Sequence, residues 1–115
     1  MKKVLKPNPK YQGDADSERR LEQALERAFE RDAQLRIEYD TELMNLHIAR
    51  LVRSLRKEKH ITQFELAKRI GVPQSFVSRI ENPMSDKEPN LQTLAKLANA
   101  FGKKMVIEWV DTLPD

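Results

Sequence analysis

The stretch TQFELAKRIGVPQSFVSRIEN, residues 62–82, decides the fold of this chain. Thr62 and Glu65 have the spacing of a capping box, which predicts the start of a helix. Gly71 is suited to the left-handed residue that ends this helix, and Pro73 is favourable at the start of the next. Two helices joined by so short a turn must cross steeply.

The residues on the two faces of this helix pair indicate what it does. Ala67 is the small residue that a close crossing needs, and the apolar side chains expected on the inner face are Leu66, Ile70, Val72, Val77 and Ile80. The second helix would keep four polar side chains outside: Gln74, Ser75, Ser78 and Arg79. Gln can pair bidentately with adenine and Arg with guanine, so we interpret this helix as a major-groove recognition helix. A generic pair of helices with a solvated outer face is the alternative.

The rest of the chain is also expected to be helical. Residues 14–70 contain no Gly or Pro, and their apolar residues recur at spacings of three and four. Ser17 is the expected N-cap of the first helix, and a break is expected near Asp40 or Thr41. Asn90 should cap a last helix that ends before Gly102.

Residues 103–110, KKMVIEWV, change the pattern to β-branched and aromatic residues and predict a strand. Met105, Ile107 and Trp109 would share one face of it. Because no other strand is evident, the expected partner is the same strand of a second subunit, which makes these three residues the predicted dimerisation contacts.

Charge divides the 115 residues into blocks. The net charge is +4 over residues 1–13, −5 over 14–42, +5 over 43–83 and −1 over 84–115. We expect a flexible basic tail at 1–13, an acidic helical extension at 14–42, a DNA-binding domain at 43–102 and a C-terminal strand and tail at 103–115.

Composition argues against several classes of protein. The chain has no Cys and two His, His47 and His60, so neither disulfides nor a metal site is expected. It has no apolar run of about 20 residues and no signal peptide, which predicts a cytoplasmic protein. The acidic residues of 14–42 lie along a helix without a nucleophile, so we expect no enzyme and no cofactor.

Residues 44–102 resemble the Xre-type helix-turn-helix family, as the phrases LRKEKHITQFELAKRIGVPQSFVSRIEN and PNLQTLAKLANAFG show. The resemblance implies a mainly α, five-helix DNA-binding domain that acts as a homodimer on a palindromic operator. It implies that Gln63 contacts a phosphate and braces Gln74. The implied DNA-binding residues are Gln63, Pro73, Gln74, Ser75, Ser78, Arg79, Lys87 and Asn90. Pro73 departs from the family, which usually has Ser or Thr at this position.

The layout of the whole chain resembles HigA-type antitoxins, which repress their own operon and neutralise a RelE-like ribonuclease toxin. The resemblance implies that the acidic extension covers a small basic toxin, and Leu21, Leu25 and Phe29 would be its partner-binding residues. The alternative is a plain Xre-type transcriptional regulator without a toxin partner, whose extension only packs or dimerises.

Overall fold

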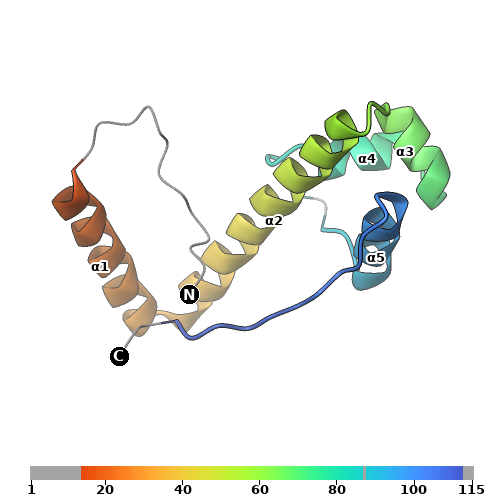
Figure 1. Cartoon of the computed structure of the whole chain (residues 1–115). Helices are drawn as coiled ribbons and strands as arrows, with labels where there is room; N and C mark the ends of the chain where they lie inside the picture. The colour runs from red at the N-terminus through yellow and green to blue at the C-terminus, as the bar shows by residue number, and fades with distance from the viewer. Residues whose placement is uncertain (1–13, 87, 113–115) are drawn as a thin grey trace. The chain divides into compact units, whose positions relative to one another are not determined.

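The structure is a computed structural model that describes residues 14–86 and 88–112. The predicted flexible basic tail, residues 1–13, therefore lies outside the described residues. The described residues form five helices: α1 (Ala15–Arg31), α2 (Ala33–Glu58), α3 (Gln63–Ile70), α4 (Gln74–Ile80) and α5 (Leu91–Ala100) (Figure 1). The chain divides into two compact units after Leu43, within α2.

The N-terminal unit begins with a cap that differs from the expected one. Asp14 is the N-cap of α1, and its carboxylate accepts the backbone N–H of Ser17 at 2.6 Å. Ser17 is inside the helix, so the prediction of Ser17 as the N-cap is wrong by three residues. This bond from the Ser17 N–H also holds the pKa of the Asp14 carboxyl below its usual value.

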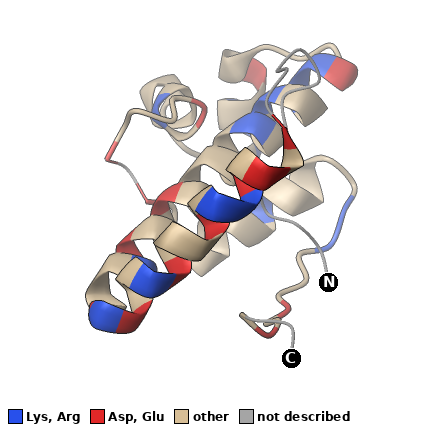
Figure 2. Cartoon of the chain, turned by 90° about the vertical axis from the view of Figure 1, so that its left-hand side faces the viewer, with Lys and Arg blue, Asp and Glu red and all other residues tan. Residues whose placement is uncertain are grey.

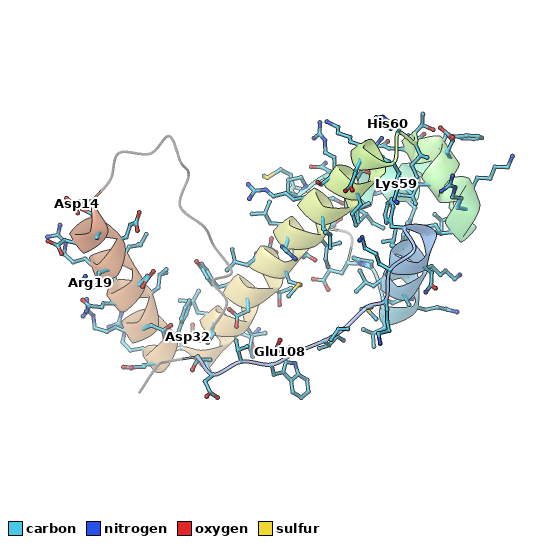
Figure 3. All side chains as sticks on the ribbon, viewed as in Figure 1. Asp14, Arg19, Asp32, Lys59, His60 and Glu108 are labelled. Atoms are coloured by element: carbon cyan, nitrogen blue, oxygen red, sulfur yellow. The ribbon has the colours of Figure 1, made fainter. Side chains whose placement is uncertain are left out.

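The first two helices are separated at Asp32 (Figure 3). The prediction of a break near Asp40 or Thr41 is wrong, because both residues lie within α2. Asp32 has an extended backbone, and its carboxylate accepts the N–H groups of Gln34 and Leu35 at 3.1 and 3.3 Å. This carboxylate satisfies donors that the first turn of α2 leaves open. Thr41 lies inside α2, where its hydroxyl donates to the carbonyl of Ile37 at 2.7 Å.

Phe29 is the buried apolar side chain among the described residues of the N-terminal unit. Its ring lies 5.3 Å from that of Tyr39, and the Arg36 guanidinium lies 5.0 Å above it. Arg36 also pairs with Glu26 at 3.0 Å. These contacts hold α1 against the beginning of α2.

The C-terminal unit has a core built around α3, which packs against both α4 and α5. Its buried side chains are Val52, Ile61, Leu66, Ala67, Ile70, Val77, Ile80, Leu97 and Phe101. Leu66 and Val77 are completely buried at the crossing of the two short helices. The predicted inner face is thus confirmed, with Val72 partly buried against the same core.

Local signals also set the ends of the short helices. The Thr62 hydroxyl accepts the Glu65 N–H and the Glu65 carboxylate accepts the Thr62 N–H, both at 3.0 Å, so the predicted capping box is present. Gly71 is left-handed with φ 75°, as expected for the end of α3. Asn90 caps α5 by accepting the Thr93 N–H at 2.8 Å.

Two expectations about the architecture are wrong. Residues 103–112 contain no strand, and Ile107 and Trp109 are 61% and 94% exposed. A strand requires a neighbour for its backbone groups, and the described residues supply none, so β-type composition alone did not produce one. The described residues of the domain predicted at 43–102 (43–86 and 88–102) contain four helical segments rather than five. The fifth helix of the chain, α1, belongs to the N-terminal unit.

Candidate nucleic-acid interface

The outer face of α4 is polar and exposed. Gln74, Ser75, Ser78 and Arg79 all lie on this face, while Val77 and Ile80 fix the opposite side of the helix in the core. Pro73 is the N-cap and makes no side-chain capping bond, as expected from its missing hydroxyl. The α4 helix therefore exposes four side chains with hydrogen-bonding groups, and the packing of Val77 and Ile80 in the core holds the helix in place.

A chain of side-chain hydrogen bonds connects α4 to α3. Gln74 Nε2 donates to Gln63 Oε1 at 2.9 Å, and Gln63 Nε2 donates to Glu81 Oε1 at 3.2 Å. The first bond is the bracing contact that the family resemblance implies. We call these two amides and the Glu81 carboxylate the glutamine relay.

A buried ion pair supports the relay from the side of α2. Arg56 Nε and Nη2 donate to the two oxygens of Glu81 at 2.7 and 2.9 Å, and the Glu81 side chain is 4% exposed. The hydrogen bond to Glu81 raises the pKa of the Arg56 guanidinium above its ordinary value. Both charges of this pair are compensated within the protein.

Sequence reasoning missed Arg56 and Glu81, although a signal was present. Glu81 follows Val77 by four residues and therefore falls on the buried side of α4. A carboxylate at such a position needs a cation, and the basic end of α2 provides one. Arg53 was also missed: it lines a polar cleft together with Arg56, Gln63, Ser78, Glu81, Asn82 and Pro83.

The remaining predicted DNA contacts are placed less closely together. Gln63 and Pro73 belong to the α3–α4 region, whereas the Asn90 side chain is exposed and occupied as the cap of α5. Lys87 lies outside the described residues. The structure therefore gathers six of the eight predicted contacts on two adjoining helices.

The predicted partner-binding and dimerisation residues differ in their exposure. Leu21 is 63% exposed and Leu25 is partly buried, but Phe29 is buried beside Tyr39 and cannot anchor a partner without opening the N-terminal unit. Met105 is partly buried.

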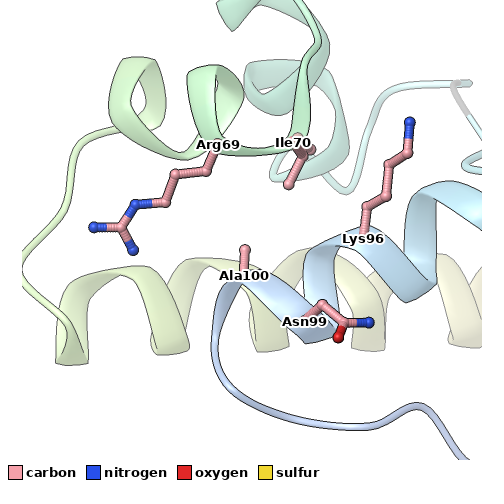
Figure 4. Close-up of a pocket in the computed structure, with 5 residues that line it drawn as sticks. All are labelled: Arg69, Ile70, Lys96, Asn99 and Ala100. Carbon is pink, nitrogen blue, oxygen red and sulfur yellow. The ribbon is translucent and has the colours of Figure 1, made fainter.

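A second cleft lies between α3 and α5 and is lined by Arg69, Ile70, Lys96, Asn99 and Ala100 (Figure 4). This lining contains two cations and no carboxylate, and thus offers no acid–base pair. Within the described part of the chain, no group of three His, Cys, Asp or Glu side chains is arranged to hold a metal ion. No helix in this part is long and apolar enough to cross a membrane.

Comparison with known proteins agrees with the geometry of the C-terminal unit. Residues 52–107 match the family described as Helix-turn-helix. This segment is similar to helix-turn-helix domains. It contains α3, α4, α5 and the end of α2, and so the whole glutamine relay and its ion pair.

A segment of 48 residues is 40% identical to the "ImmF control region 10 kDa protein" of Bacillus phage phi105. The match covers 42% of this chain and 51% of the phage protein, so the chain spans about half the length of this relative. Neither comparison supports the resemblance of the layout to HigA-type antitoxins.

Proposed function

We propose that this chain is a transcriptional regulator whose helix-turn-helix domain binds a specific DNA sequence, with α4 in the major groove. The observation that carries the proposal is the exposed face of Gln74, Ser75, Ser78 and Arg79 above buried Val77 and Ile80. The net charge of +5 over residues 43–83 favours a polyanionic partner. The name of the phage relative, a control-region protein, fits the same function.

The proposal includes a homodimer on a palindromic duplex. Two bound copies would place their α4 helices in successive major grooves, about 34 Å apart. The function is binding without catalysis, in the cytoplasm where the DNA is. The proposed dimer interface does not include residues 103–112, because they contain no strand.

The test begins with selection from randomised duplexes by the full chain, followed by gel-shift titration at one fixed salt concentration. Arg79→Ala should cost about 1–3 kcal/mol on the selected duplex and relax one base position. Arg69→Ala is the matched control, because it removes the same charge from the cleft between α3 and α5. Equal effects of the two variants on affinity, without a change in base preference, would refute the assignment of α4 as the recognition helix.

A second candidate function is that of an antitoxin, and one observation favours it. Residues 14–42 carry a net charge of −5, lie within a compact unit separate from the helix-turn-helix segment, and leave Leu21 exposed. Such a surface suits a small basic protein such as a RelE-like ribonuclease. Against this candidate, basic residues are interspersed with the acidic ones along the helices of this chain (Figure 2).

Co-expression with a neighbouring small basic reading frame tests this candidate. A truncated chain that lacks residues 1–40 should lose toxin binding and keep DNA binding. If the truncated chain still neutralises the toxin, the acidic extension is not the inhibitor. If no such reading frame exists, only the proposed function as a transcriptional regulator without a toxin partner remains.

A further inference from the structure

The cleft between α3 and α5, which we call the basic cleft, has an apolar floor and a cationic rim. Ile70 is buried and Ala100 is partly buried, and together they form the floor. Arg69 and Lys96 are exposed and lie on opposite sides of this floor (Figure 4). The cleft has a volume of about 350 Å³ and shares no lining residue with the polar cleft beside α4.

The charge of the basic cleft is only weakly compensated within the described part of the chain. Neither Arg69 nor Lys96 forms an ion pair with a described residue. Glu65 interacts with Arg69 through its charge, but its carboxylate is engaged by the Thr62 N–H in the capping box. Residues 91–107 contain three cations and no acid. Such a surface attracts an anionic partner.

The floor of the basic cleft indicates which anionic partner fits. The phosphates of a DNA duplex can pair with the two cations, but they leave the apolar floor uncovered. A protein surface covers it when an exposed apolar side chain has an acid on each side. The apolar side chain then loses its contact with water on the floor, and the acids meet the cations at the rim.

The beginning of α2 carries a surface of this kind. Ile37 is 57% exposed, and Glu38 and Asp40 are exposed as well. An α-helix turns by about 100° per residue, so the two acids lie on opposite sides of Ile37. We call these three residues the acidic ridge. Asp40 Oδ2 lies 3.6 Å from Arg36 Nε, and Glu38 forms no ion pair with a described residue.

We propose that the acidic ridge of one copy docks into the basic cleft of a second copy, and that the reciprocal contact closes a homodimer. Ile37 covers the floor, and the two acids of the ridge pair with the two cations of the rim. The occupant is a second copy because this chain itself carries the matching charges. Two reciprocal contacts have twofold symmetry and leave no open end. The inference rests on the proposed function, to whose homodimer it assigns an interface.

The experiment measures the mass of the full chain by sedimentation equilibrium over a range of concentrations, after thermal unfolding has shown that each variant folds. The wild type should be a dimer that dissociates on dilution and at high salt. The cleft variant is Arg69→Glu/Lys96→Glu, and the ridge variant is Glu38→Lys/Asp40→Lys. Each should raise the dissociation constant by about tenfold or more. The control Glu22→Lys/Glu30→Lys makes the same change in charge at exposed positions of α1 and should leave the constant unchanged.

A mixture of the two variants gives the sharper test. The acidic ridge of the cleft variant fits the basic cleft of the ridge variant, and the reversed ridge fits the reversed cleft. The mixture should therefore form heterodimers at concentrations at which each variant alone is a monomer. Damage to the fold of either variant cannot produce this recovery.

Three results would overturn the inference. The first is a cleft variant that dimerises as tightly as the wild type, and the second is a mixture that stays monomeric. The third is a wild type with the mass of a monomer at every concentration, because any docking would then lie within one chain. If the ridge variant does not fold, Ile37→Ala replaces it, and an unchanged dissociation constant overturns the inference.

These outcomes are distinguishable from failure of the proposed function. A dimer that forms through other surfaces refutes the inference and leaves DNA binding intact. A wild-type dimer that selects no duplex refutes the proposed function and leaves the dimer contact intact. In the gel-shift titration, Arg69→Ala should lower the affinity at low protein concentration and keep the base preference, unlike Arg79→Ala, because Arg69 lies in the basic cleft.

Discussion

Arg56 and Glu81 are 25 residues apart in the sequence and meet through two charge-assisted hydrogen bonds of 2.7 and 2.9 Å. Arg56 also donates from Nη1 to the carbonyl of Ile61 at 3.0 Å. A single guanidinium thus joins the end of α2, the residue after α4 and the loop before α3. The pair connects the helices that present the glutamine relay.

Removal of one partner of this pair should destabilise the domain strongly. Arg56→Met leaves the buried Glu81 carboxylate uncompensated, and we expect the free energy of unfolding to fall by about 3–5 kcal/mol. The double variant Arg56→Met/Glu81→Leu removes both charges and should recover most of this loss. Urea unfolding measures the free energy of unfolding of both variants, and Arg53→Met, on the exposed side of α2, is the control. A double variant as unstable as the single one would contradict this explanation.

The two histidines should respond to the same substitution with opposite signs. His60 has a left-handed backbone with φ 56°, just after α2 (Figure 3), and glycine adopts this conformation without crowding of Cβ. His60→Gly should raise the free energy of unfolding by roughly 0.5 kcal/mol after the entropy of the unfolded chain is counted. His47→Gly, in the exposed middle of α2, should lower it by roughly 0.5 kcal/mol. Chemical denaturation of both variants tests the sign, and shifts in the same direction would count against the backbone argument.

The capping box of α3 should contribute to stability in a pH-dependent way. The Thr62 backbone N–H, followed by the Thr62 side chain, holds the pKa of the Glu65 carboxyl below its usual value. Because the folded state lowers this pKa, the contribution is complete above the unfolded pKa of about 4.3 and is lost as the pH falls through the lower folded value.

Glu65→Gln keeps a capping residue at this position without a titrating group. The stability of this variant should therefore fall less steeply than that of the wild type below about pH 4.3. Thr62→Ala removes the hydroxyl cap but keeps the backbone N–H that donates to Glu65, so it should lose about 1 kcal/mol at neutral pH and retain part of the acid slope. Thermal unfolding at a series of pH values measures both, and an acid slope that Glu65→Gln leaves unchanged would exclude this carboxylate as its source.

The N-terminal unit should depend on Phe29 and not on Leu21. Phe29→Ala removes the ring that meets Tyr39 and Arg36 and should abolish the hydrogen-exchange protection of α1. Leu21→Ala changes a side chain that is 63% exposed and should leave this protection unchanged. The amides of α3 serve as the internal reference, because they belong to the other compact unit. Protected α1 amides in Phe29→Ala would show that other contacts hold the helix.

Residues 62–82 illustrate what could be predicted without a structure. The Thr62–Glu65 capping box, the left-handed Gly71 and the inner face around Leu66 and Val77 follow from short-range rules. Such rules depend on residues a few positions apart, so the printed sequence contains all of the information that they need. The exposed face of α4 follows from the same periodicity.

The glutamine relay shows what only the tertiary structure decided. Which cation neutralises Glu81, and which way the Gln63 amide turns, depend on α2, α3 and α4 meeting in space. The strand expected at residues 103–110 was wrong for the related reason that a strand exists only where a neighbour accepts its backbone hydrogen bonds. The sequence alone therefore determined the helices with local start and stop signals and the side chains that α4 exposes. The pairing of distant charges, the burial of Phe29 and the fate of the C-terminal segment depended on contacts between residues far apart in the chain.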